Sequence, residues 1–81
     1  MLQEVKLILS EALGIGNKVN NFTEETALLG NVAEFDSMAV VTVITSIEEY
    51  YGIIIEDDEI SAETFETVGS LCGFIKYKLA Q

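Results

Sequence analysis

Two adjacent residues, Asp36 and Ser37, have the types and the position to support chemistry. They begin the apolar part of the segment AEFDSMAVVTVITSIEEYYG, residues 33–52, whose spacing predicts a helix. Asp and Ser are both favoured N-cap residues. If Asp36 caps the helix, Ser37 presents a free hydroxyl at a helix N-terminus, where an attached phosphodiester would be stabilised. If Ser37 and Asp36 form only an ordinary capping sequence, no chemistry follows, and the dipeptide alone does not decide between these interpretations.

The residues that the chain lacks exclude several kinds of catalytic and metal chemistry. It has no histidine and a single cysteine, Cys72, so it cannot form a Ser-His-Asp triad, a Cys-His pair, a zinc finger or an internal disulfide. The acidic run EDDE at 56–59 lacks the ligand spacing of a calcium loop. We therefore expect no enzyme and no metal site, and we interpret Cys72 as a small apolar core residue.

The charge of the chain favours basic protein partners. Fourteen acidic residues stand against four basic ones, for a net charge of −10, and no basic residue lies between 19 and 75. Such a surface repels nucleic acid and anionic lipids. No apolar run approaches the roughly 20 residues of a membrane span, and the first residues do not resemble a signal peptide. We expect a cytoplasmic monomer that neither binds nucleic acid nor inserts into membranes.

Helical periodicity predicts an all-α fold in a single domain, residues 1–81. The expected helices cover residues 2–13, then Asp36 to Tyr51, and finally a segment capped by Thr67, with glycines as stop signals after the first two. Asp57 or Ser61 can cap short helical turns before the last helix. The architecture is a small four-helix bundle with three longer helices, one short helix and a long first loop over residues 14–35.

Apolar positions at i, i+3, i+4, i+7 and i+11 define the predicted core. In the three longer helices they are Leu2, Val5, Ile8, Leu9 and Ala12; Val40, Val43, Ile44, Ile47 and Tyr51; and Val68, Leu71, Cys72, Ile75 and Leu79. Between the longer helices, the apolar candidates are Phe22, Leu28, Leu29 and Val32 in the first loop, and Ile53, Ile54, Ile55, Ile60 and Phe65 before the last helix. Lys76 and Lys78 lie near the C-terminus of the last helix, where positive charge is favourable.

The side of the second helix away from this stripe is apolar at its start and acidic at its end. Met38 and Val41 either form an apolar anchor for a partner or only widen the core stripe. Nearby acidic residues can attract a basic patch. The predicted partner-binding residues are Asp36, Met38, Val41, Thr42, Thr45, Glu48, Glu49, Asp57, Asp58 and Glu59.

Four segments together resemble the acyl carrier protein family, also called phosphopantetheine-attachment domains. They are LLG at 28–30, DSM at 36–38, IEEYYGI at 47–53 and FETVGSL at 65–71. The resemblance implies a four-helix fold in which Ser37 receives 4′-phosphopantetheine from coenzyme A through a phosphopantetheinyl transferase. It implies acyl groups carried as thioesters, and partners that include an acyl-loading ligase or acyltransferase and other carrier-dependent enzymes with basic docking patches.

Within that family, EFDSMAVV and DDEISAETFETVGSL are similar to free-standing carriers associated with bacterial exosortase and exopolysaccharide systems. Ala39 and Thr42 stand where carriers of fatty-acid synthesis usually have exposed acids, which makes exchange with fatty-acid synthase partners doubtful. Two other functions stay open. The chain would then be an unmodified acidic helical adaptor, or a regulatory domain phosphorylated at Ser37 beside Glu34 and Asp36.

Overall fold

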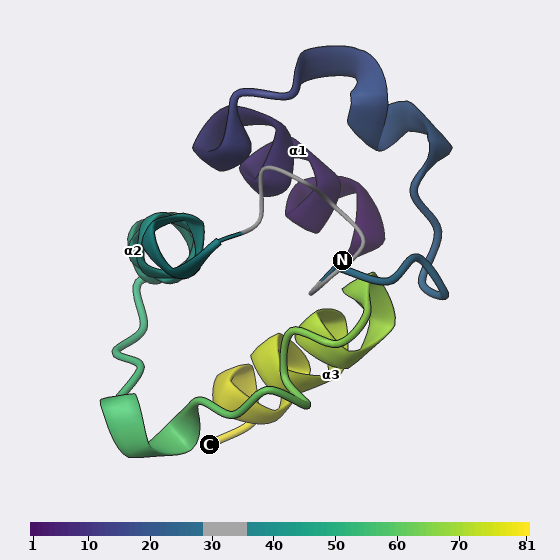
Figure 1. The fold of residues 1–81 in the computed structure, drawn as a ribbon. Coiled ribbons are helices and arrows are strands. Elements are labelled where there is room, and N and C mark those ends of the chain that lie inside the picture. The colour runs from purple at the N-terminus through teal and green to yellow at the C-terminus, as the bar shows by residue number, and fades with distance from the viewer. Residues whose placement is uncertain (29–35) are drawn as a thin grey trace.

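The regular elements are all helices in the part of the chain that a computed structural model describes, residues 1–28 and 36–81. The elements are α1 (Leu2–Leu13), the 3-10 helix η1 (Gly16–Asn21), α2 (Ser37–Tyr51), the 3-10 helix η2 (Asp57–Glu59) and α3 (Val68–Leu79) (Figure 1). The predicted all-α fold with three longer helices is confirmed. Within the described ranges, no helix combines the length and apolar character that a bilayer crossing requires.

The helix ends follow from capping chemistry. Gly14 and Gly52 close α1 and α2 with φ of 65° and 66°, in the left-handed region that glycine adopts without steric penalty. Thr67 caps α3 as predicted, and its hydroxyl accepts from the Ser70 amide at 3.0 Å. The Ser70 hydroxyl accepts in return from the Thr67 amide at 3.0 Å, which completes a capping box. The sequence did not predict the box because Glu or Gln usually fills this third position.

The core lies around α1, which packs against α2, η1 and α3. Most predicted stripe positions are buried or packed against the core, and Cys72 is buried as expected. Leu79 was predicted to lie on the α3 stripe but is 44% exposed. It is the last residue of α3, so the helix carries it beyond the core. Two further apolar positions predicted in the first loop, Leu29 and Val32, lie outside the described residues.

The described part of the first loop, residues 14–28, contains a 3-10 helix that the sequence does not predict. Residues 14–35 were expected to form a loop, but η1 lies within it, and Ile15 and Val19 bury their side chains there. Two buried residues in so short a segment, among Gly and Asn, are too few to reveal a helical period.

Further along, the loop is fastened to the start of α3. Ala27 and Thr67 form an isolated antiparallel bridge. The Leu28 amide donates to the Glu66 carbonyl at 2.9 Å, and the Val68 amide donates to the Thr26 carbonyl at 2.9 Å. These bonds hold Leu28, which is fully buried, against the last helix.

The first loop also approaches α3 closely at Gly69, and this approach predicts opposite effects for two alanine substitutions in α3. A Cβ at Gly69 would lie 2.7 Å from the Glu24 carbonyl oxygen, whereas a Cβ at Gly73 would meet nothing within 4 Å. Gly69→Ala should lower the free energy of unfolding by about 1–3 kcal/mol through overpacking. Gly73→Ala should raise it by up to about 1 kcal/mol because alanine is the better helix former. Thermal melts of both variants, with about 4–8 °C expected per kcal/mol, check this, and shifts of the same sign would contradict it.

Candidate functional site

The N-terminus of α2 separates the roles of Asp36 and Ser37. Asp36 has extended backbone, with φ −110° and ψ −173°, and its Oδ1 accepts from the Ala39 amide at 2.8 Å. Its carbonyl accepts from the Val40 amide at 3.0 Å, the first bond of the helix. Asp36 is therefore the N-cap. Ser37 is the first residue of α2 and is exposed. Because Asp36 makes the capping bond, the cap does not use the Ser37 hydroxyl.

An exposed hydroxyl at this position fits a long phosphate-linked group. The first amide groups of a helix have no partners within the helix, and the helix dipole adds partial positive charge there. A phosphodiester on Ser37 would lie beside these groups. Because Ser37 is on the surface, a flexible arm attached to it would extend into solvent without displacing core residues.

Met38 and Val41 are surface residues rather than an extension of the core. Met38 is 75% exposed and Val41 is 61% exposed, which supports the interpretation as an apolar anchor over that of a broad core stripe. Thr42 and Thr45 are also exposed, and their hydroxyls donate to the carbonyls of Met38 and Val41 at 3.1 and 3.0 Å.

Ala39 corrects one expectation. It was predicted on the exposed face of α2, but it is buried at 9% exposure. The helical period explains the difference, because Ala39 lies four residues before Val43 and therefore on the same side of the helix. Ala39 and Thr42 were the two positions compared with carriers of fatty-acid synthesis, and of these the structure exposes Thr42.

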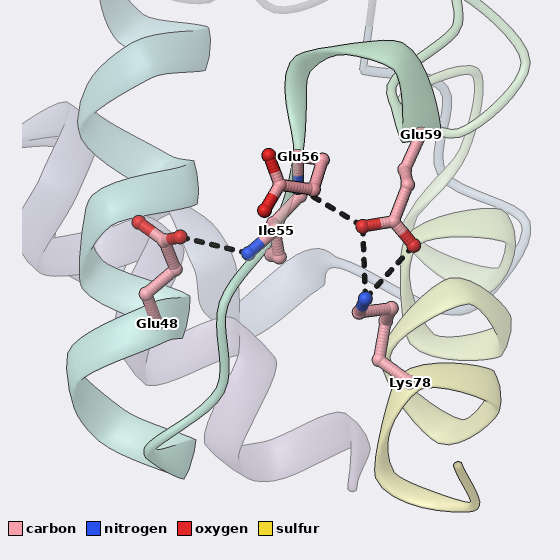
Figure 2. A network of polar contacts seen from close by, with 5 residues as sticks. All are labelled: Glu48, Ile55, Glu56, Glu59 and Lys78. Atoms are coloured by element: carbon pink, nitrogen blue, oxygen red, sulfur yellow. Dashed lines mark hydrogen bonds and ion pairs between the residues drawn. The ribbon is translucent and has the colours of Figure 1, made fainter.

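The predicted docking acids fall into two groups. Glu49 and Asp58 are exposed, and the side chain of Asp57 lies outside what the structure describes. Asp36, Glu48 and Glu59 accept hydrogen bonds from backbone amides of the chain itself. Figure 2 shows the bonds to Glu48 and Glu59.

Glu59 belongs to an ion pair that ties η2 to α3. Both of its carboxylate oxygens accept from Lys78 Nζ at 2.8 Å, and Oε1 also accepts from the Glu56 amide at 2.9 Å. The hydrogen bond from Lys78, followed by the one from the Glu56 amide, lowers the pKa of the Glu59 carboxyl.

Ile54 is an exposed apolar residue, although the sequence predicted it in the core. Ile53, Ile54 and Ile55 were expected to be core candidates together, but Ile55 is 7% exposed and Ile54 is 72% exposed. Gly52 was the signal available in the sequence, because it ends the helix. In an extended chain after a helix, successive side chains point to opposite sides, so the three isoleucines cannot all face the core.

The remaining chemically interesting groups belong to the core or form no site. Burial raises the pKa of the Cys72 thiol, which keeps it protonated and unreactive. In residues 1–28 and 36–81, no three acidic or cysteine side chains are grouped so that they could hold a metal ion.

Comparison with known proteins agrees with the geometry. Residues 3–75 match the family described as "Phosphopantetheine attachment site". The chain is also similar to a holo acyl carrier protein from Nitrosomonas europaea, solved by solution NMR, with 50% identity and a TM-score of 0.91. The match covers 99% of this chain and 96% of that one, and it confirms the predicted acyl-carrier fold. The chain therefore belongs to the acyl carrier proteins, a family of non-catalytic carriers with a phosphopantetheine attachment site.

Proposed function

We propose that Ser37 is the residue that receives 4′-phosphopantetheine, and that the chain presents acyl groups to partner enzymes from this position. The observation that carries the proposal is the exposed Ser37 hydroxyl beside a cap already filled by Asp36. Family membership implies an attachment residue. Ser37 has the DSM context of that residue and is the first residue of α2.

The chemistry at Ser37 is divided between this chain and a separate transferase. The Ser37 oxygen forms a bond to the phosphorus that carries pantetheine as the pyrophosphate bond of coenzyme A breaks and adenosine 3′,5′-bisphosphate leaves. The hydroxyl proton passes to a base on the transferase. The attached group would supply a thiol on which acyl groups travel as thioesters. The chain contributes a fixed attachment point, so that tethering raises the effective concentration of the acyl group at any docked enzyme.

Docking of partners uses the exposed side of α2. Met38 and Val41 offer apolar area next to Ser37, and the exposed acids Glu49 and Asp58 can attract basic patches and accelerate encounter. The partners that fit are a phosphopantetheinyl transferase, an acyl-loading ligase or acyltransferase, and other carrier-dependent enzymes. Residues 1–81 would act as a single cytoplasmic, monomeric carrier domain.

The finer assignment concerns the pathway. The segments EFDSMAVV and DDEISAETFETVGSL support a free-standing carrier associated with exosortase and exopolysaccharide systems. The exposed Thr42 adds to this, because fatty-acid carriers usually place an acid there and Thr42 offers a basic partner no charge. The chain should therefore be a poor substitute for the carrier of a fatty-acid synthase.

Replacement of Ser37 tests the attachment residue. Incubation with coenzyme A and a promiscuous phosphopantetheinyl transferase should add one arm to the wild-type chain and none to Ser37→Ala, as read from the intact mass. Ser61→Ala, which removes another exposed serine hydroxyl, should be modified like the wild type. Full modification of Ser37→Ala would refute the assignment. A wild-type chain that gains no arm would instead favour the unmodified adaptor, and a phosphate on Ser37 of the chain from its native cells would favour the regulatory domain.

A charge placed on the apolar anchor tests the docking surface. Val41→Asp should change the free energy of unfolding by no more than about 0.5 kcal/mol because the site is exposed, yet it should slow modification of Ser37. Val43→Asp is the matched control, since Val43 is fully buried and an unpaired carboxylate there should unfold the domain. Thermal melts and modification rates of the two variants check both expectations. Modification of Val41→Asp at the wild-type rate would remove Val41 from the docking surface.

A further inference from the structure

A groove with a volume of about 260 Å³ lies between α1 and α2. Ile8 lines it and is only 4% exposed, so the groove has an apolar floor. The other lining residues are Glu11 from α1 and Ser46, Glu49 and Tyr50 from α2. Because both helices contribute, the groove is a product of their packing and not of one helix alone.

The polar side chains of this α1–α2 groove are not used by the fold. Among the described residues, the carboxylates of Glu11 and Glu49 and the hydroxyls of Ser46 and Tyr50 take part in no hydrogen bond or ion pair. The two threonine hydroxyls of α2, by contrast, donate to backbone carbonyls of their own helix. The groove therefore presents four polar groups whose hydrogen-bonding capacity is open to a ligand.

The chemistry of the lining favours a planar cation. Ionised carboxylates only accept hydrogen bonds, the face of a tyrosine ring attracts a cation, and none of the four basic residues of the chain lines the groove. A guanidinium group pairs with a carboxylate through two parallel hydrogen bonds and stacks on aromatic rings. An ammonium group is a compact and strongly hydrated point charge. The lining therefore suits arginine better than lysine.

The size and openness of the groove restrict the ligand to a side chain. Pockets that enclose free small molecules usually measure about 300–1,000 Å³ and cover most of the ligand. This groove is smaller, and Glu11, Glu49 and Tyr50 are exposed. A side chain delivered by a docked protein needs no such enclosure, because the rest of the interface contributes to binding. The Tyr50 ring is oriented for contact by an edge-to-face arrangement with Tyr51, with 4.8 Å between the ring centroids.

The groove is continuous with the proposed docking surface of α2. Met38, Thr42, Thr45 and Glu49 follow one another at i, i+4, i+7 and i+11, which places them on one side of the helix. All four are exposed. Glu49 also lines the groove, so a protein that covers this side of α2 meets the groove at its edge.

A partner that acts on Ser37 can reach this far. A helical rise of about 1.5 Å per residue places Tyr50 about 20 Å from Ser37 along α2. A standard interface covers about 800 Å² on each partner, which is roughly 30 Å across. One docked transferase can therefore engage Ser37 and the groove together.

We infer that the α1–α2 groove receives an arginine side chain of the phosphopantetheinyl transferase, so that recognition extends from α2 onto Glu11 of α1. Glu11 and Glu49 accept hydrogen bonds from the guanidinium group, and the Tyr50 ring packs against its plane. This inference rests on the proposed function, because the transferase acts on Ser37. It concerns binding alone, since these residues lie away from the reacting atoms.

Titration of the unmodified chain with N-acetyl-arginine amide, followed by NMR, tests the groove without any enzyme. The probe should shift the amide signals of the residues that line the groove. N-acetyl-lysine amide should bind more weakly, and N-acetyl-citrulline amide, which has the planar shape without the charge, should cause no such shifts. Glu11→Gln should weaken the arginine probe by about two- to fivefold, as for loss of an exposed ion pair.

Two substitutions of Tyr50 separate the ring from the hydroxyl. Tyr50→Leu removes the aromatic face and should weaken the arginine probe by about two- to fivefold. Tyr50→Phe keeps the ring and should bind the probe more tightly than Tyr50→Leu. If Tyr50→Leu fails to fold, Glu11→Gln still tests the inference, because it changes only an exposed side chain.

Kinetics of the transferase test the role of the groove in recognition. Glu11→Gln should raise the KM for the chain by about two- to fivefold with kcat little changed, as for loss of an interaction made equally before and during the reaction. Glu63→Gln is the matched control. It removes the same charge from an exposed residue that does not line the groove, and its KM should stay near the wild-type value.

Several results would overturn the inference. Equal binding of the arginine and citrulline probes, or tighter binding of lysine, would reject an arginine site. A wild-type KM in Glu11→Gln would remove α1 from recognition, and an equal rise of KM in Glu63→Gln would make net charge the cause. A wild-type chain that gains no arm would refute the proposed function itself, whereas binding of the arginine probe does not depend on that function.

Discussion

The hydrogen bond from the Ala39 amide to the Asp36 carboxylate fixes where α2 begins, and the whole candidate site depends on that start. The buried residues Ala39, Val43 and Ile47 fix which side of α2 faces the core, whereas the cap decides which side chain is used at the start. A start one residue later would make Ser37 the N-cap and would engage its hydroxyl with an amide of the first turn. An N-cap contributes only about 0.5–2 kcal/mol, but total stabilities of about 5–15 kcal/mol make that a large share for a small domain.

Carboxylates organise the far end of α2 as well. The carboxylates of Glu48 and Glu59 accept from the backbone amides of Ile55 and Glu56, which lie between α2 and η2. The Asp36 carboxylate accepts from the Ala39 amide in the same way. An acidic chain with a net charge of −10 therefore uses some of its acids as internal hydrogen-bond acceptors, where each satisfies a backbone group that would otherwise need water. These acids keep their negative charge. Glu59 is paired with Lys78, whereas Glu49 and Asp58 are exposed and their charge can attract a basic partner.

The parts of the structure that depend on local sequence could be predicted from it. The bounds of α1, the stop at Gly52 and the caps at Asp36 and Thr67 all follow from periodicity and from favoured capping residues. Ser37 could be proposed as the attachment residue because its neighbours along the chain carry the motif.

The features that could not be predicted depend on contacts between distant or irregular segments. Lys78 and Glu59 are 19 residues apart, and the Glu48 side chain bonds to a backbone amide beyond a helix stop. No residue pattern reports such bonds. The exposure of Leu79 likewise depends on where the core ends rather than on spacing. The burial of Ala39, in contrast, follows from the helical period, because Ala39 lies four residues before the buried Val43.

The assignment of Ser37 is tested most directly by fragment-ion mass spectrometry of the intact chain after reaction with the transferase and coenzyme A. The added mass should reside entirely on Ser37, and an added mass on any other residue would contradict the assignment.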